Sequence, residues 1–275
     1  MRLTAFILTI IFLAGCTNKK KVYVEKLYRE LRIHDSLGHY DSSLKLSSEL
    51  MKLAPKDLRA FIAHAKAVAA LGDTAAAIAE LDQIILKHPN DQAYLLKAFF
   101  YIGTDNKQTV NFLHEALVIN PDLEPAYGML AQIYTFEIEN RDSALHYVHI
   151  LEQRKADDFG SLIVFQNAYL KYGPPEKLLA STTRLIEKKP KEPYPYNNRG
   201  FAEIKLRMFD EARRDILNSL SIDPTNSFAY KNLGLLFIEL KQKDSACFYL
   251  QTANAKGFKE NFGNEVDRLI RIHCQ

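Results

Sequence analysis

One stretch of the sequence, residues 193–257, contains the same pattern twice at a spacing of 34 residues, because Tyr196–Phe201 aligns with Tyr230–Leu235. Five prolines follow the same period, with successive spacings of 34, 32, 69 and 34 residues, and 69 is close to two periods. The prolines in question are Pro55, Pro89, Pro121, Pro190 and Pro224. A fixed period of this length is the signature of a repeat protein, in which each repeat buries its apolar face against its neighbours. The sequence therefore predicts a stack of similar repeats over residues 24–258.

The prolines divide this stack into seven repeats. Their bounds are residues 24–57, 58–91, 92–123, 124–158, 159–192, 193–226 and 227–258. Each repeat contains two apolar-periodic stretches of helical length, separated by a break such as Leu71-Gly72-Asp73. No alternating strand pattern with an Asn-Gly or Asp-Gly turn occurs, so we expect an all-α protein built from helix-turn-helix repeats.

A last amphipathic segment follows the seventh repeat, in residues 259–275. It places five residues on one helical face over Lys259–His273: Phe262, Val266, Leu269, Ile270 and His273. The end repeats of such a stack need a polar outer cover, and we expect this segment to be the C-terminal capping helix.

The repeat resembles the tetratricopeptide repeat (TPR), in which small residues recur where neighbouring helices approach closely and bulky residues fill the space between them. The small residues that carry the resemblance are Ala65, Ala77, Ala98, Ala116, Ala131, Gly200, Ala212, Gly234, Ala246 and Ala253. The fifth repeat departs from the pattern, with Gln166 and Leu178 at two of these positions. The resemblance implies a right-handed superhelical solenoid whose first helices line a concave face.

The composition is that of a globular protein, with 47% hydrophobic and 25% charged residues. The formal net charge of +3 is small for 275 residues. A polyanionic partner is therefore not indicated, and we predict no binding to nucleic acid.

The N-terminus resembles a bacterial lipoprotein signal. Met1-Arg2 is followed by the apolar run Leu3–Leu13 and then by Ala14-Gly15-Cys16. The resemblance implies that residues 1–15 are a signal peptide, that cleavage leaves Cys16 as the first residue, and that its thiol carries the lipid. An uncleaved membrane anchor and an ordinary secretory signal are the alternatives.

Residues 16–23 would then form a short tether, and Lys19, Lys20 and Lys21 in it could contact acidic head groups. Thr17, not aspartate, follows the cysteine, which in many lineages directs a lipoprotein to the outer membrane. We therefore expect a lipid-anchored envelope protein that faces the periplasm from the outer membrane.

Two cysteines remain, Cys247 in the last repeat and Cys274 near the end of the capping segment. Antiparallel packing of that segment on the last repeat would bring them together in an oxidising compartment. A disulfide and two separate thiols are both consistent with the sequence.

Motifs of catalysis are missing from the sequence: it has no phosphate-binding glycine loop, His-Glu-x-x-His helix, Cys-x-x-Cys pair or Gly-x-Ser-x-Gly elbow. His146 and His149 lie three residues apart without an evident third ligand, and a helix surface explains them better than a metal site. We predict no catalytic residues, metal, cofactor or small-molecule substrate.

The resemblance implies a peptide-binding groove on the concave face, formed by the first helices of the fifth to seventh repeats. Its predicted residues are Asn167, Tyr194, Asn197, Asn198, Phe201, Lys205, Phe228, Lys231, Asn232 and Leu235. Asn198 and Asn232 occupy equivalent positions, and amides repeated along a groove can satisfy the backbone of an extended peptide. Lys205 and Lys231 would favour acidic or C-terminal carboxylate groups. The alternative is that the asparagines only brace the inner face.

These features favour a membrane-anchored adaptor that binds a protein or peptide partner on the concave face. The alternative is an immunity or stress lipoprotein that neutralises a toxin by wrapping it, and an envelope hydrolase is the least supported interpretation. The sequence does not select the partner.

Overall fold

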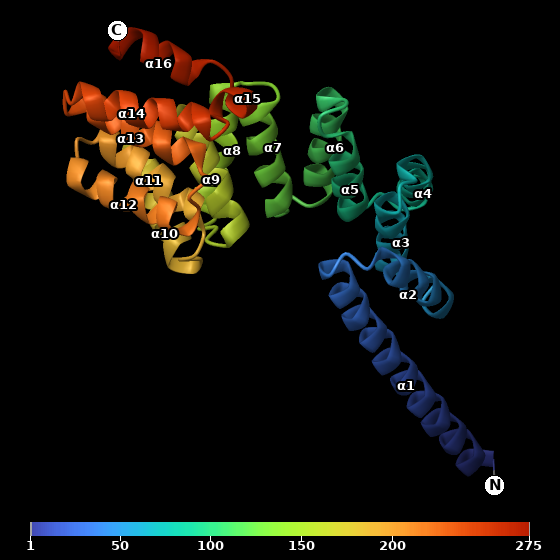
Figure 1. The fold of residues 1–275 in the computed structure, drawn as a ribbon. Coiled ribbons are helices and arrows are strands. Elements are labelled where there is room, and N and C mark those ends of the chain that lie inside the picture. Colours follow the sequence, from blue (N-terminus) through green and yellow to red (C-terminus); the bar gives the residue numbers. More distant parts are fainter. Residues whose placement is uncertain (1, 275) are drawn as a thin grey trace. The chain divides into compact units, whose positions relative to one another are not determined.

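The computed structural model describes the backbone of residues 2–274 and the side chains of residues 19–274. Throughout this range the regular structure is helical, with no strand, and consecutive helices pack in pairs (Figure 1). The predicted all-α class of helix-turn-helix repeats is therefore confirmed. By its internal contacts the chain divides into two compact units, residues 1–126 and residues 127–275.

The first compact unit contains three helical hairpins. They are α1 (Arg2–Ser36) with α2 (Tyr40–Leu53), α3 (Leu58–Ala70) with α4 (Thr74–Lys87), and α5 (Asp91–Tyr101) with α6 (Asn106–Ile119). Acidic or amide side chains begin several of these helices, as where Asp73 accepts a hydrogen bond from the backbone N–H of Ala76 and Asn90 accepts from that of Ala93. Such caps satisfy backbone donors that have no partner within the helix.

Helix α1 continues through the predicted signal sequence and tether into the first repeat. Lys19, Lys20 and Lys21 are exposed on it, and its buried side begins at Val24. The side chain of Cys16 lies outside the described part, so its lipidation stays a prediction. Among the described residues, none of the helices combines the length and the apolar character needed to cross a bilayer.

The second compact unit continues the same pattern. Helix α7 (Glu124–Phe136), which begins just before the boundary, pairs with α8 (Arg141–Gln153). The remaining hairpins are α9 (Phe159–Tyr172) with α10 (Pro175–Lys188), α11 (Pro193–Lys205) with α12 (Phe209–Ile222), and α13 (Ser227–Glu239) with α14 (Lys243–Ala255). Each hairpin lies within the bounds of one predicted repeat.

Close contact between the helices of a hairpin depends on the small residues of the repeat. A Cβ atom built on Gly200 would lie 2.6 Å from Cγ1 of Ile216, and one on Gly234 would lie 2.6 Å from Cδ2 of Leu250. Real Cβ atoms do not approach this closely, so these two positions require glycine as long as the opposing side chains stay in place.

The C-terminal segment forms two helices where the sequence predicted one: α15 (Phe258–Phe262) and α16 (Glu265–His273). The break falls at Gly263, whose φ of +81° belongs to the left-handed region that glycine tolerates. Phe258 and Val266 are fully buried and hold the two helices on α14. A disulfide joins Cys247 of α14 to Cys274, with Cα atoms 5.6 Å apart.

Candidate functional site

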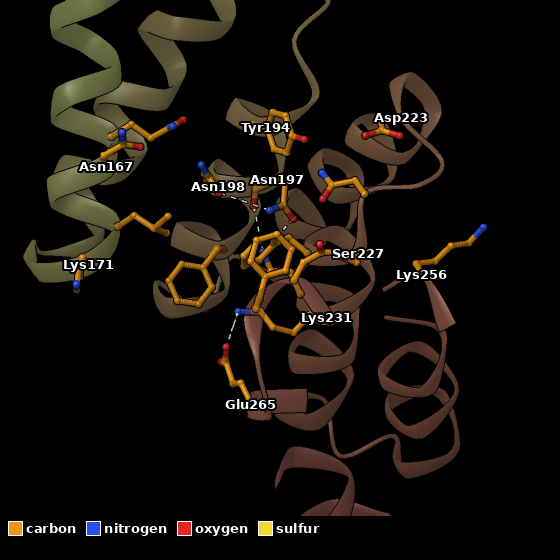
Figure 2. Close-up of a pocket in the computed structure, with 18 of the residues that line it drawn as sticks. Asn167, Lys171, Tyr194, Asn197, Asn198, Asp223, Ser227, Lys231, Lys256 and Glu265 are labelled. Carbon is orange, nitrogen blue, oxygen red and sulfur yellow. Dashed lines mark hydrogen bonds and ion pairs between the residues drawn. The ribbon is translucent and has the colours of Figure 1, made fainter. Parts of the chain in front are cut away.

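The second compact unit contains a groove of about 1330 Å³. Its walls come from α9, α11 and α13, the first helices of three consecutive repeats, together with α15, α16 and the C-terminal end of α7. The lining residues are Phe136, Glu139, Gln166, Asn167, Leu170, Lys171, Tyr194, Asn197, Asn198, Phe201, Asp223, Thr225, Asn226, Ser227, Phe228, Lys231, Asn232, Lys256, Asn261, Phe262 and Glu265. Figure 2 shows Asn167 and Lys171, which lie on α9, and Tyr194, Asn197 and Asn198, which lie on α11.

Of the ten predicted groove residues, eight line this groove. Lys205 instead lines a smaller neighbouring pocket of about 220 Å³, which shares Leu170 and Phe201 with the groove. Leu235 is absent from the lining and packs beside the buried core formed by α11, α12 and α13. The predicted asparagines, the predicted aromatics and Lys231 therefore line one groove, and Lys205 and Leu235 lie outside its lining.

Three asparagine side chains form a hydrogen-bonded chain that runs from the interior to the groove. Nδ2 of Asn232 donates to Oδ1 of Asn197 over 2.9 Å, and Nδ2 of Asn197 donates to Oδ1 of Asn198 over 3.4 Å (Figure 2). Asn232 and Asn197 are buried, whereas Asn198 is partly exposed. The two residues that are equivalent in the repeat, Asn198 and Asn232, therefore differ: Asn232 braces the floor, and Asn198 ends the chain at the surface.

Gln166 also lines the groove, although the sequence did not place it there. It occupies a small-residue position of the repeat, where Gly200 and Gly234 stand in the two following repeats, and it is only 4% exposed. Its Oε1 has no hydrogen-bond partner. In the sequence, the only sign of this residue is that a large polar side chain replaces the small residue of the repeat.

Lys231 is buried in the groove, with its Nζ 3.5 Å from both carboxylate oxygens of Glu265 on α16 (Figure 2). Nζ also lies 5.3 Å from the ring centre of Phe228, 5.7 Å from that of Phe258 and 5.9 Å from that of Phe201. Burial lowers the pKa of this ammonium group, and Glu265 partly opposes the shift. The cation is thus paired with a carboxylate and enclosed by aromatic rings. The sequence did not indicate this pair, because Glu265 belongs to α16, which lies beyond the periodic repeats.

A second lining cation, Lys171, is also paired but is exposed to solvent. Nζ of Lys171 lies 2.8 Å from Oε1 of Glu139 and donates to the backbone carbonyl of Thr135 over 3.0 Å. The remaining charged residues of the lining are Lys256, which is exposed, and Asp223, which accepts hydrogen bonds from Thr225. The groove therefore has no net charge, since three acidic and three basic side chains line it.

Comparison with known proteins gives a fold but no close relative. No protein-family model matches the sequence, and no curated protein matches it either. Among solved structures, a tetratricopeptide repeat protein from Parabacteroides merdae ATCC 43184 matches 92% of this chain and 99% of its own, with a TM-score of 0.52 and 15% identity.

Two further structures are similar over shorter spans. YrrB, a TPR protein with an unusual peptide-binding site, matches 68% of this chain and 97% of its own, with a TM-score of 0.57 and 15% identity. The MamA protein matches 62% and 94%, with a TM-score of 0.52 and 16% identity. At these identities the likeness concerns the fold, and the fold of this chain is that of the tetratricopeptide repeat proteins.

Proposed function

We propose that this chain is a protein-interaction adaptor that binds an extended polypeptide segment in the groove of its second compact unit. The observation that carries the proposal is the chain of amides from Asn232 through Asn197 to Asn198, which reaches the groove between exposed aromatic side chains. An extended segment presents backbone N–H and C=O groups that need partners, and a carboxamide offers both a donor and an acceptor. Among proteins of the same fold, YrrB has a peptide-binding site.

We also propose that the adaptor is anchored in the bacterial envelope through a lipid on Cys16 and faces the periplasm from the outer membrane. The support is the Leu13-Ala14-Gly15-Cys16 motif after an apolar run, together with the exposed lysines that follow it. The anchor would concentrate the groove at the membrane surface. If it exists, Cys16→Ala releases the protein from the membrane fraction and abolishes labelling with palmitate; unchanged membrane association of this variant would contradict it.

The peptide-binding proposal is tested by photocrosslinking at defined positions of the full chain in its own cells. A photoreactive amino acid at Tyr194, which is 55% exposed in the groove, is expected to capture a polypeptide. The same amino acid at Leu217, which is 44% exposed on α12, serves as the matched control because it does not line the groove. Equal capture at both positions would argue against a specific groove.

The amide chain is tested in the same assay. Asn198→Ala combined with Asn232→Ala should remove the Tyr194 crosslink, because it removes both ends of the chain. Asn218→Ala, an exposed asparagine on α12, should leave the crosslink intact. Thermal unfolding of each variant separates a lost groove contact from a lost fold, and unchanged crosslinking by a folded double variant would exclude the amides from binding.

A further inference from the structure

We propose that the segment bound in this groove is uncharged and inserts apolar side chains, and that it is neither an acidic peptide nor a C-terminal carboxylate. This rests on the proposed peptide binding and specifies the chemistry of the partner. Three independent features of the lining support it: compensated charges, buried acceptors without donors, and half-exposed apolar walls.

The two cations on the helices of the groove, Lys231 and Lys171, are paired with carboxylates of the chain itself, and the third lining cation, Lys256, is exposed. A ligand carboxylate at Lys231 would have to displace Glu265, whose two oxygens both lie 3.5 Å from the buried Nζ. Nζ of Lys171 already contacts Glu139 at 2.8 Å and the carbonyl of Thr135 at 3.0 Å, and it is exposed to solvent, where a further ion pair adds little affinity. Exchanging one carboxylate for another gains little, while the incoming carboxylate loses its hydration. The one buried cation of the lining, Lys231, is therefore not free to form a new ion pair with an acidic ligand.

The unpartnered polar atoms in the buried lining are acceptors. Oε1 of Gln166 and Oδ1 of Asn232 have no hydrogen-bond partner, although the two side chains are 4% and 3% exposed. A buried acceptor without a donor is unfavourable, so a ligand that supplies N–H groups at this floor is favoured. Backbone and side-chain amides supply such donors, whereas a carboxylate would be repelled by these oxygens.

The upper walls of the groove are apolar and remain half exposed. Four apolar side chains in these walls have large exposed fractions: 50% for Phe136, 40% for Leu170, 55% for Tyr194 and 51% for Phe262. The sequence placed Phe262 on one face of a single capping helix. Because the helix breaks at Gly263, Phe262 instead ends α15 and lines the groove. Removing such apolar surface from water is favourable, and an apolar ligand side chain achieves this without desolvating a charge.

The small pocket beside the groove continues this apolar surface. Tyr169, Leu170, Pro175, Leu178 and Phe201 line it, and its volume is about 220 Å³. Since Leu170 and Phe201 border both spaces, a segment lying in the groove can place one large apolar side chain in this pocket. Lys205 lies at the pocket with its Nζ 5.3 Å from the ring centre of Phe201, so part of its charge interacts with that ring.

The test is selection from a library of random decapeptides on the immobilised full chain, followed by affinity measurements with the selected synthetic peptides. We expect enrichment of Phe, Leu, Ile and Tyr and depletion of Asp and Glu. Amidation of the peptide C-terminus should leave the Kd unchanged, and a rise from 50 to 500 mM NaCl should change it by less than about twofold, because the contacts are not ionic.

Two variants connect the selected peptides to the features above. Gln166→Ala should weaken binding about fivefold through loss of its amide, and it is compatible with the fold because Ala or Gly stands at the equivalent position of most other repeats. Phe262→Ser should weaken binding about tenfold, because it removes an aromatic side chain that an apolar ligand side chain would cover. Asn218→Ala is the matched control.

The possible outcomes separate the two proposals. Selection of acidic peptides, or of peptides that need a free C-terminal carboxylate, would overturn this inference and leave peptide binding intact. No enrichment over the Asn198→Ala, Asn232→Ala variant would overturn both. A dimer detected by light scattering that Phe262→Ser dissociates would show that the groove holds a second copy of this chain, and would also overturn the inference.

Discussion

Two neighbouring hairpins, α11–α12 and α13–α14, have the same backbone plan and different interiors. Both have a glycine where the two helices approach closely, Gly200 and Gly234. In each case a Cβ atom at this position would lie only 2.6 Å from a side chain of the facing helix. The residues that fill the seam between the helices differ at three equivalent positions. Arg199, Glu203 and Asp215 in α11–α12 stand where α13–α14 has Leu233, Phe237 and Tyr249.

The seam of α13–α14 is aromatic. The rings of Phe237 and Tyr249 stack with their centres 5.3 Å apart and their planes 4° from parallel. In α11–α12 the guanidinium of Arg199 donates to Asp215, with Nη2 2.9 Å from Oδ1. Glu203 is buried beside this pair, and its Oε2 has no hydrogen-bond partner.

The difference shows that the small residues determine how closely the helices approach. The space between the helices can be filled by either aromatic or charged side chains. An aromatic seam stabilises by burial and contact, whereas an ionic seam must offset the desolvation of each charge. The two hairpins should therefore respond oppositely to mutation at equivalent positions.

The largest effect is expected in the aromatic seam. Phe237→Ala should lower the free energy of unfolding by about 3–4 kcal/mol, because it removes a 94% buried ring and leaves a cavity against Tyr249. Urea unfolding followed by circular dichroism measures it. Phe248→Ala on α14, where the side chain is 62% exposed, is the matched control and should cost less than about 0.5 kcal/mol. Similar losses for both variants would mean that the seam adds no special stability.

A smaller loss is expected when the ion pair of the other seam is broken. Asp215→Asn keeps the shape but leaves the guanidinium of Arg199 without its charged partner, which should cost about 2 kcal/mol because Arg199 retains some solvent contact. The same urea experiment applies. Adding Arg199→Leu, the residue of the aromatic seam, should recover most of the loss, and a double variant less stable than Asp215→Asn would contradict this account of the pair.

The sequence predicted the repeat architecture because the small residues and the prolines recur at a fixed period, and those residues determine helix approach and helix ends. It also placed most of the groove asparagines and aromatics, since the repeat register decides which face of a helix they occupy. It did not predict the pairing of Lys231 with Glu265 or the exposure of Phe262. Both depend on how α15 and α16 turn at Gly263, outside the periodic region.

Gln166 and Glu203 show a related limit. Gln166 replaces a small residue of the repeat, which marks it as an exception in the sequence, whereas Glu203 is distinguished only by the aromatic Phe237 at the equivalent position of the next repeat. What each exception does depends on neighbours from other helices. For Gln166 these neighbours leave an unpartnered acceptor in the groove, and for Glu203 they leave an unpartnered carboxyl oxygen beside the Arg199–Asp215 pair.

The smallest of the three expected effects, and the one of opposite sign, concerns Glu203. Burial raises the pKa of its carboxyl to about 7, and the neighbouring charge of Asp215 adds to this, while Arg199 opposes it. An unfolded chain ionises this group near its ordinary value of 4.5. Between pH 4.5 and 7 the unfolded state therefore loses its proton first, so ionisation favours unfolding and this group lowers stability as the pH rises.

Glu203→Gln removes the titrating group and keeps its size. The variant should have nearly the stability of the wild type at pH 4.5 and exceed it by about 1 kcal/mol at pH 8. This is about a third of the upper bound of about 3 kcal/mol that a pKa of about 7 against 4.5 would allow, because a fold relaxes around a buried charge. Other carboxyl groups titrate alike in both proteins and cancel in the difference. Melting temperatures across this range measure the divergence, and Glu203→Leu should show the same pH dependence. A constant difference across the range would mean that Glu203 is already ionised in the folded protein. In that case the Arg199–Asp215 pair would tolerate a third charge, and the ionic seam would be less desolvated than its burial indicates.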